Sequence, residues 1–227
     1  MALNFNASQV AAGLALTIFG AGLSAFLGTD YEGKTVEALP SLVLWGLQDI
    51  PIIGKALFAQ DAIVYLSWIL VIVVYAFFKH HRAGLAVRAV GESPSVGNNL
   101  GLPVMRIRYL AIMFGGAMAG LAGAYLSLAY TPLWTENMTA GRGWIALALV
   151  VFASWRVARV IIGAYLFGFA SIMHLVAQGL GMSIDSNLLA MLPYLATLVV
   201  LIVLSKDKEK LKLFEPISLG KPWHKNQ

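Results

Sequence analysis

The chain has 227 residues, of which 59% are hydrophobic and only 12% are charged, and its formal net charge is +5. Soluble domains carry about 25% charged residues, so this chain has too few polar side chains to cover a globule in water. Composition therefore excludes an ordinary soluble domain and predicts an all-α, polytopic membrane protein. The absence of cysteine excludes disulfides, thiolate metal sites and cysteine nucleophiles.

Six segments are predicted to cross the membrane as helices, which takes about 20 mostly apolar residues, or somewhat fewer where the bilayer thins. The second and the sixth are the clearest, because Val, Ile, Leu and aromatic residues dominate them. The other four contain more Gly and Ala, as is typical of helices packed inside a bundle. In chain order, the predicted spans are Val10–Leu27, Ala62–Phe78, Tyr109–Tyr130, Trp144–Ser154, Val160–Leu180 and Leu188–Leu204.

Loop charge predicts the orientation. Six spans put both termini on one side, and the positive-inside rule makes that side the cytoplasm. We therefore expect a single membrane domain over residues 1–227, with an outer loop at 28–61, a cytoplasmic loop at 79–108 and a cytoplasmic tail at 205–227. Thirteen of the sixteen basic residues are then cytoplasmic: Lys79, Arg82, Arg88, Arg106, Arg108, Arg156, Arg159, Lys206, Lys208, Lys210, Lys212, Lys221 and Lys225. The positive charge thus indicates topology rather than nucleic-acid binding.

The outer loop contains a pattern that resembles a phosphate-binding loop. Residues 28–35 match GxxxxGK[ST], but that motif binds phosphate only between a strand and a helix. Here it follows a membrane helix, and two acidic residues, Asp30 and Glu32, lie within it. We therefore expect no nucleotide to bind there.

Small residues mark one face of the third predicted span. Gly116 and Gly120 form a GxxxG pair, followed by Gly123, with alanines between them. Such a face allows close approach of another helix. Two interpretations remain open: tight packing within the chain, which we favour, and dimerisation of two subunits.

The predicted membrane interior contains almost no charge. His174, in the fifth span, is the only ionisable residue placed well inside a helix. Proton-driven transporters usually carry several such groups as a relay, whereas a single histidine also suits a hydrogen-bonded packing role. We therefore expect the energy for transport to come from another chain. The alternative is an ion- or proton-driven secondary transporter of a small polar solute.

The loop at 79–108 is basic and is predicted to contain a short helix near Ser93–Leu102, with Ser93 or Ser95 as its N-cap. An ordinary connector held by lipid phosphates is one interpretation. A compact helix after Gly91 and Glu92 instead favours a rigid ledge against which a soluble partner can press.

The segment before the fourth span is polar. Asn137, Thr139 and Arg142 offer hydrogen-bonding groups, and Gly141 and Gly143 allow the backbone to bend. Irregular polar backbone at membrane depth tends to line a pathway, so we predict a substrate pathway here. The alternative is an outer loop whose Arg142 reaches the membrane interface.

Taken together, these segments resemble the permease subunits of ABC importers for simple sugars and nucleosides, a family that also handles ribose and branched-chain amino acids. The resemblance covers most of the chain, in the family's order. It is carried by QVAAGLALTIFGAGLSAFLG (9–28), RAVGESP (88–94), NNLGLPVMRIRYLA (98–111), GGAMAGLAGAYLSL (115–128), NMTAGRGWIALALVVFASW (137–155) and GAYLFGFA (163–170).

The resemblance implies a set of partners. Such permeases pair with a second permease, homologous or identical, sit on two cytoplasmic ATPase subunits that bind the ATP, and receive substrate from an extracytoplasmic binding protein. It implies a bacterial plasma (inner) membrane location, no cofactor on this chain and no enzyme activity. It also implies that the ATPase couples to the loop through Arg88, Gly91, Glu92, Pro94, Asn98 and Gly101.

Three features depart from the family pattern. Ser93–Pro94 and Val96–Gly97 stand where the family has Asn-Pro and a pair of small alanines. After the fourth span, Ala153 and Val157 stand where the family has Gly and Pro. The family is also longer, with further spans ahead of the first one here, and Met1–Asn6 reads like an interior segment. We therefore expect a truncated chain, a late start or a naturally reduced permease.

Overall fold

The computed structural model describes residues 3, 7–43, 57–139, 141–180, 191, 195, 198, 199, 202, 216–221 and 223, without the side chains of 174, 175, 177 and 178. The chain divides into two compact units, which are described separately. The first comprises Met1–Ala140 with Ile217–Gln227, and the second comprises Gly141–Pro216.

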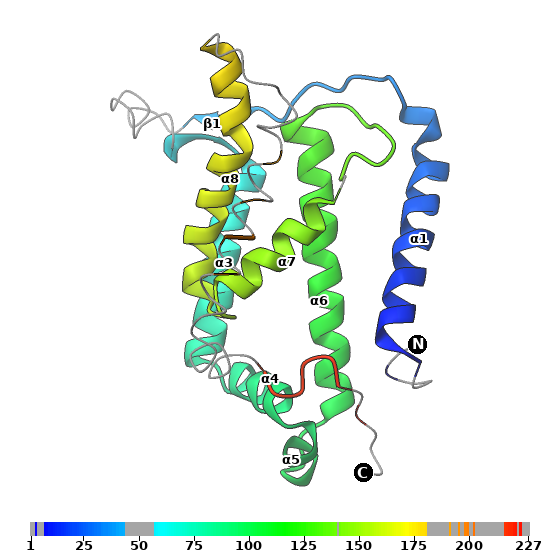
Figure 1. The fold of residues 1–227 in the computed structure, drawn as a ribbon. Coiled ribbons are helices and arrows are strands. Elements are labelled where there is room, and N and C mark those ends of the chain that lie inside the picture. The colour runs from blue at the N-terminus through cyan, green and yellow to red at the C-terminus, as the bar shows by residue number, and fades with distance from the viewer. Residues whose placement is uncertain are drawn as a thin grey trace. The chain divides into compact units, whose positions relative to one another are not determined.

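Helices dominate the first unit (Figure 1). In chain order they are α1 (Gln9–Gly28), η1 (Thr29–Tyr31), α3 (Ala62–His80), α4 (Arg82–Glu92), α5 (Pro94–Asn99), α6 (Val104–Tyr125) and the π-helical turn η2 (Leu126–Tyr130). The second unit contains α7 (Arg142–Phe152) and α8 (Val157–Gly179).

Three helical segments in the described residues are long and apolar enough to cross a membrane: Gln9–Tyr31, Ala62–His80 and Val104–Tyr130. Their large side chains are open to the surroundings; Ile18 and Ile72, for example, are 74% and 66% exposed. Continuous apolar surface of this kind requires lipid or a protein partner rather than water. A mostly helical fold is therefore confirmed, with three candidate membrane spans in the described residues.

The predicted spans differ from the helices mainly at their ends. The third begins at Val104 rather than Tyr109, because the basic residues Arg106 and Arg108 continue the helix instead of ending it. The fourth and fifth match α7 and α8 to within a few residues, as shorter apolar helices. Most of the predicted sixth span, 188–204, lies outside the described residues. A total of six spans therefore stays a prediction.

A small antiparallel sheet lies in the outer loop 28–61, where the sequence predicted no strands. Strand β1 (Ser41–Val43) pairs with β2 (Ala59–Asp61), with Leu42 opposite Gln60. Directly after β2, the Asp61 carboxylate caps α3 by accepting the backbone N–H groups of Ile63 and Val64 at 2.9 and 3.0 Å. Local apolar periodicity did not reveal these strands, because each is only three residues long.

The first part of this loop lies along the residues that follow α6. Val36 donates its N–H to the Pro132 carbonyl at 3.0 Å, and Leu39 donates to the Leu128 carbonyl at 3.1 Å. Gly28, the first glycine of the phosphate-loop pattern, is buried against the Trp134 ring, where an added Cβ would overlap the indole. The packing of Trp134 therefore requires glycine at position 28.

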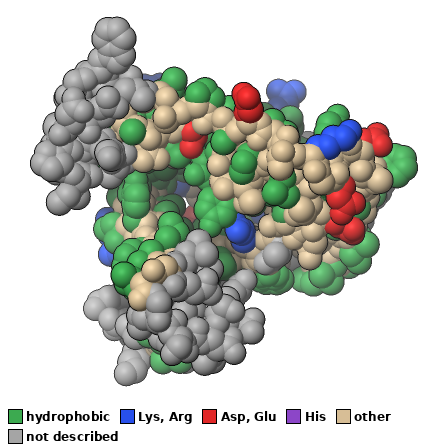
Figure 2. Space-filling view, turned by 90° about the horizontal axis from the view of Figure 1, so that it is seen from above, with side chains coloured by type: hydrophobic (Ala, Val, Ile, Leu, Met, Phe, Trp, Pro, Cys, Tyr) green, Lys and Arg blue, Asp and Glu red, His purple; other side chains and the backbone are tan. Residues whose placement is uncertain are grey.

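Charged side chains are exposed in the same loop. Asp30, Glu32 and Lys34 are all solvent-exposed. Seen from above, the described surface carries acidic and basic side chains among mostly uncharged ones (Figure 2). This polar surface contrasts with the apolar sides of α1, α3 and α6.

In the second unit, α7 and α8 approach closely at Gly163. A Cβ added there would lie 2.9 Å from Cδ1 of Phe152, and Phe152 meets Phe167 edge to face at 6.3 Å. α7 ends at Phe152 in a Schellman motif, in which Ser154 and Trp155 donate to the Val151 and Val150 carbonyls. Ser154 and Trp155 have left-handed φ angles of 50° and 55°.

Candidate functional site

The short helix predicted near Ser93–Leu102 is α5, and its start is well defined. Ser93 is the N-cap, and its Oγ accepts the Val96 N–H at 3.4 Å. Pro94 occupies the first helical position, where a missing N–H costs nothing and the fixed φ suits a helix. Of the two serines considered as caps, Ser93 is therefore the one that caps α5.

The end of α5 is equally well defined. Gly101 has φ +78° and donates its N–H to the Asn98 carbonyl at 3.0 Å. Leu102 donates to the Gly97 carbonyl, also at 3.0 Å. These two bonds form a Schellman motif, whose left-handed position favours glycine. A helix of only six residues thus holds a definite conformation because both of its ends are satisfied.

Gly97 sets how closely α5 packs on its neighbours. It is buried, and a Cβ added there would lie 3.1 Å from Cγ2 of Val90 in α4 and 3.6 Å from Cγ2 of Val104 in α6. Val90 and Val104 are each only 2% exposed. The three helices therefore share a small close-packed core, although most of the first unit's described apolar surface is open.

α4 is in turn attached to α3. The two helices meet at His81, whose N–H donates to the Phe77 carbonyl at 3.1 Å. A Cβ at Gly84 would overlap that same carbonyl, so the backbones approach as closely as glycine permits. The Arg88 guanidinium lies over the Phe78 ring at 5.4 Å from its centroid. α3, α4, α5 and α6 thus form a connected series of packed contacts.

Exposed apolar side chains remain on α4 and α5, which with Leu100 and Gly101 we call the α4–α5 module. Leu85 of α4 is 60% exposed, Val96 of α5 is 55% exposed, and Leu100 just after α5 is 71% exposed. We call the exposed residues of α4 and α5, together with Leu100, the ledge. A firmly held surface that mixes apolar and charged side chains is suited to binding a protein partner.

All six predicted coupling residues lie in α4, in α5 or directly after α5. Arg88 and Glu92 are exposed on α4, whereas Pro94 is buried at the start of α5. Asn98 and Gly101 belong to the end of α5, and the Gly91 carbonyl accepts hydrogen bonds from Ser218. Arg88 and Glu92 are accessible to a partner, while the other four shape the backbone.

The predicted pathway residues divide between the two units. Asn137 and Thr139 are exposed in a turn of the first unit, where Asn137 has a left-handed φ of 57°. Arg142 begins α7 of the second unit, after Gly141, whose φ of +77° makes the bend that the sequence predicted. That these three residues line one pathway stays a prediction.

The glycine face of α6 is open in the described structure. A Cβ added at Gly116, Gly120 or Gly123 meets no described atom within 4 Å. Close packing of this face, within the chain or between subunits, therefore stays a prediction. His174 lies in α8, but its side chain is outside the described residues.

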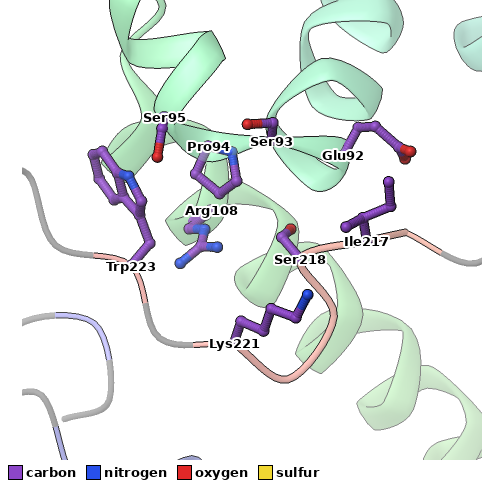
Figure 3. Close-up of a pocket in the computed structure, with 9 residues that line it drawn as sticks. All are labelled: Glu92, Ser93, Pro94, Ser95, Arg108, Ile217, Ser218, Lys221 and Trp223. Carbon is purple, nitrogen blue, oxygen red and sulfur yellow. The ribbon is translucent and has the colours of Figure 1, made fainter. Parts of the chain in front are cut away.

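The C-terminal tail makes a contact that the sequence did not reveal. Ile217, Ser218, Lys221 and Trp223 of the segment 217–223 meet the α4–α5 junction and the first turns of α6 (Figure 3). Trp223 and Ile217, apolar residues in a basic tail, were the available signals. The residues around this shallow hollow are Glu92, Ser93, Pro94, Ser95, Arg108, Ile217, Ser218, Lys221 and Trp223.

Comparison with known proteins identifies the family. Residues 2–204 match the family described as branched-chain amino acid transport system / permease component. The chain belongs to this permease family. The match confirms the resemblance to ABC importer permeases, and it shows that the chain is a membrane transport subunit and not an enzyme.

Individual relatives agree with the family. The permease is 37% identical to a putative glucose ABC transporter permease, TsgC13 of Haloferax volcanii, over 96% of this chain and 73% of that relative. It is 30% identical to the guanosine permease NupQ of Bacillus subtilis and to the nucleoside permease NupC of Lactococcus lactis. These two alignments each cover 88% of this chain and 65% of the relative. No solved structure matches the chain.

Proposed function

We propose that this permease is the membrane-spanning subunit of an ATP-driven importer for nucleosides or simple sugars, forming part of an alternating-access pathway. The relatives named for glucose, guanosine and nucleosides support this substrate class. Such solutes are polar but largely uncharged, which suits a membrane interior nearly free of ionised groups. The permease spans about two thirds to three quarters of these relatives' length, so the activity of the whole transporter is a proposal.

The observation that carries the coupling mechanism is the packing of α5. Both ends of α5 are capped, and its buried Gly97 lies between Val90 of α4 and Val104 of α6. A cytoplasmic ATPase pressing on the ledge would move α5 as a rigid body, because close-packed side chains transmit displacement rather than absorb it. α6 and α3 would then carry the movement into the membrane. Arg88 and Glu92 are the accessible charges that would meet the ATPase.

Both termini are proposed to be cytoplasmic, with α4 and α5 on the same side. Within the first unit, α1 begins at the end where α4 and α5 lie and ends beside the loop that carries β1 (Figure 1). Ile217–Trp223 meets α4 and α5 directly. These placements support the orientation that loop charge predicts, with 28–61 outside and 79–108 and 205–227 inside. The membrane would be the bacterial plasma membrane.

The remaining assignments follow from the family. A second permease, homologous or identical, would complete the pathway, and the open Gly116–Gly120 face of α6 would be available to it. An extracytoplasmic binding protein would deliver substrate to the side of the membrane on which the loop 28–61 lies. Asn137, Thr139 and Arg142 would line or gate the pathway from the outer end. ATP would bind to the ATPase subunits alone.

The test is ATP hydrolysis by the reconstituted complex. The permease, its ATPase and its binding protein would be placed in liposomes and screened with purine nucleosides, pentoses and hexoses. We expect one class of ligand to stimulate ATP hydrolysis and to be taken up in proportion to it. Uptake that needs no ATPase, and that His174→Ala abolishes, would instead establish the secondary-transporter alternative.

A further inference from the structure

The C-terminal segment binds the end of α4 through a single residue. Ser218 donates its backbone N–H to the Gly91 carbonyl at 3.3 Å, and its hydroxyl donates to the same oxygen. A turn in which Lys221 donates to the Ser218 carbonyl at 3.1 Å holds this arrangement, and Gly220 in that turn has φ +72°. Figure 3 shows Ser218 directed from the tail toward the α4–α5 junction.

These hydrogen bonds replace a local helix cap. Gly91 lies in the last turn of α4, where carbonyl groups have no donor within their own helix. Helices usually satisfy such carbonyls with the residues that follow immediately. Here only Ser93 separates α4 from Pro94 and α5, and the donor comes from a residue 127 positions away. Lys221 also lines the hollow at this end of α4, where the helix dipole favours positive charge.

A second contact attaches the same segment to α6. The Arg108 guanidinium lies 6.0 Å from the centroid of the Trp223 ring, within the range of a cation–π interaction. Ser93, Pro94 and Ser95 line the hollow between the two contacts. Ile217–Trp223 therefore touches the end of α4 and the start of α5, the two helices that carry the ledge, and also the start of α6.

We propose that Ile217–Trp223 is a latch: it fixes the angle between α4 and α5, and the permease needs it closed to transmit the ATPase stroke to the membrane helices. An unlatched junction would let α5 move relative to α4, because Ser93 is the single residue between these two helices and its extended backbone can rotate. The role in transmission rests on the proposed function, whereas the contact itself does not.

The contact is tested first, independently of transport. The natural chain contains no cysteine, so introduced thiols are unique in it. A Ser95→Cys/Lys221→Cys variant, treated in membranes with a short bismaleimide, is expected to give an intrachain link between the two peptides. The control pair is Ser95→Cys/Lys34→Cys, because Lys34 lies in the loop held beside Leu133, beyond the far end of α6. Absence of the 95–221 link, or equal linking in the control, would overturn the latch.

Transmission is tested by weakening the latch in the complete complex. Truncation after Pro216 removes the latch, and Ser218→Ala removes only the hydroxyl donor. We expect substrate moved per ATP to fall about tenfold or more on truncation and about two- to tenfold in Ser218→Ala, the range of an ordinary hydrogen bond. Ser171→Ala is the matched control, because that hydroxyl also donates to a helix carbonyl, Phe167 at 2.9 Å, and should leave the ratio unchanged.

The outcomes separate the two proposals. A truncated complex with wild-type coupling would overturn the latch's role even where the 95–221 link forms. If the truncated chain fails to assemble, coupling is measured in Ser218→Ala and Trp223→Ala instead. Wild-type coupling in both variants would overturn the latch's role in transmission. A wild-type complex without ATP-driven transport would instead defeat the proposed function, and the link would still report on the contact.

Discussion

Replacing Gly97 with leucine should disconnect α5 from the helices it packs against. A Cβ at this position lies 3.1 Å from Cγ2 of Val90, 3.6 Å from Cγ2 of Val104 and 3.8 Å from Cδ1 of Leu102. Carbon atoms pack best at about 3.5–4.0 Å, so even the first added carbon is slightly too close to Val90. Leucine adds three more carbons in a space that is already filled, and overpacking of this kind costs about 1–3 kcal/mol.

Smaller changes should give graded results. For Gly97→Ala, the better helix propensity of alanine, worth about 0.8–1 kcal/mol, opposes the tight contact with Val90, so we expect little net change. For Gly97→Leu, the cost of overpacking exceeds the gain in helix propensity, so we expect a net loss of stability. The double variant Gly97→Leu/Val90→Ala removes Cγ2 of Val90, the atom nearest to the added Cβ, so part of the loss should be recovered.

Two measurements check this reasoning. Thermal unfolding of the purified complex reports stability, and substrate uptake per ATP in liposomes reports coupling. We expect Gly97→Leu to lower both, Gly97→Ala to change neither strongly, and the double variant to lie between wild type and Gly97→Leu. Wild-type coupling in Gly97→Leu, or no recovery in the double variant, would show that the packing of α5 between α4 and α6 does not transmit the stroke.

Three further predictions follow from individual residues. Ser154→Gly should raise the free energy of unfolding by about 1 kcal/mol, because glycine adopts the left-handed φ of 50° without the penalty that serine carries; an unchanged or lower melting temperature would contradict this. Asp61→Ala should lower stability by about 0.5–2 kcal/mol through loss of the α3 N-cap, whereas Asp61→Asn should retain most of it; equal losses in both would refute the capping role. Glu92→Ala should leave folding intact, because the side chain is exposed, yet reduce uptake per ATP in the reconstituted complex. Normal coupling in that variant would remove Glu92 from the ATPase contact.

The sequence by itself determined the features that depend on neighbouring residues. A long apolar run forms a helix in lipid wherever it lies in the chain, so the predicted Val10–Leu27 and Ala62–Phe78 coincide closely with α1 and α3. Ser93 followed by Pro94 is a local start signal, and Gly101 a local stop signal, which is why α5 was predictable although it is short.

Only the tertiary structure decided which distant segments meet. The pairing of β1 with β2, the packing of Trp134 on Gly28 and the binding of Ser218 to Gly91 all join residues far apart in the chain. Each depends on a donor, an acceptor or an empty space that exists only after other elements have packed, so no local pattern encodes it. The tail illustrates this most clearly. Its charge predicted which side of the membrane it occupies, but only the packed structure shows that Ser218 donates to the Gly91 carbonyl at the end of α4.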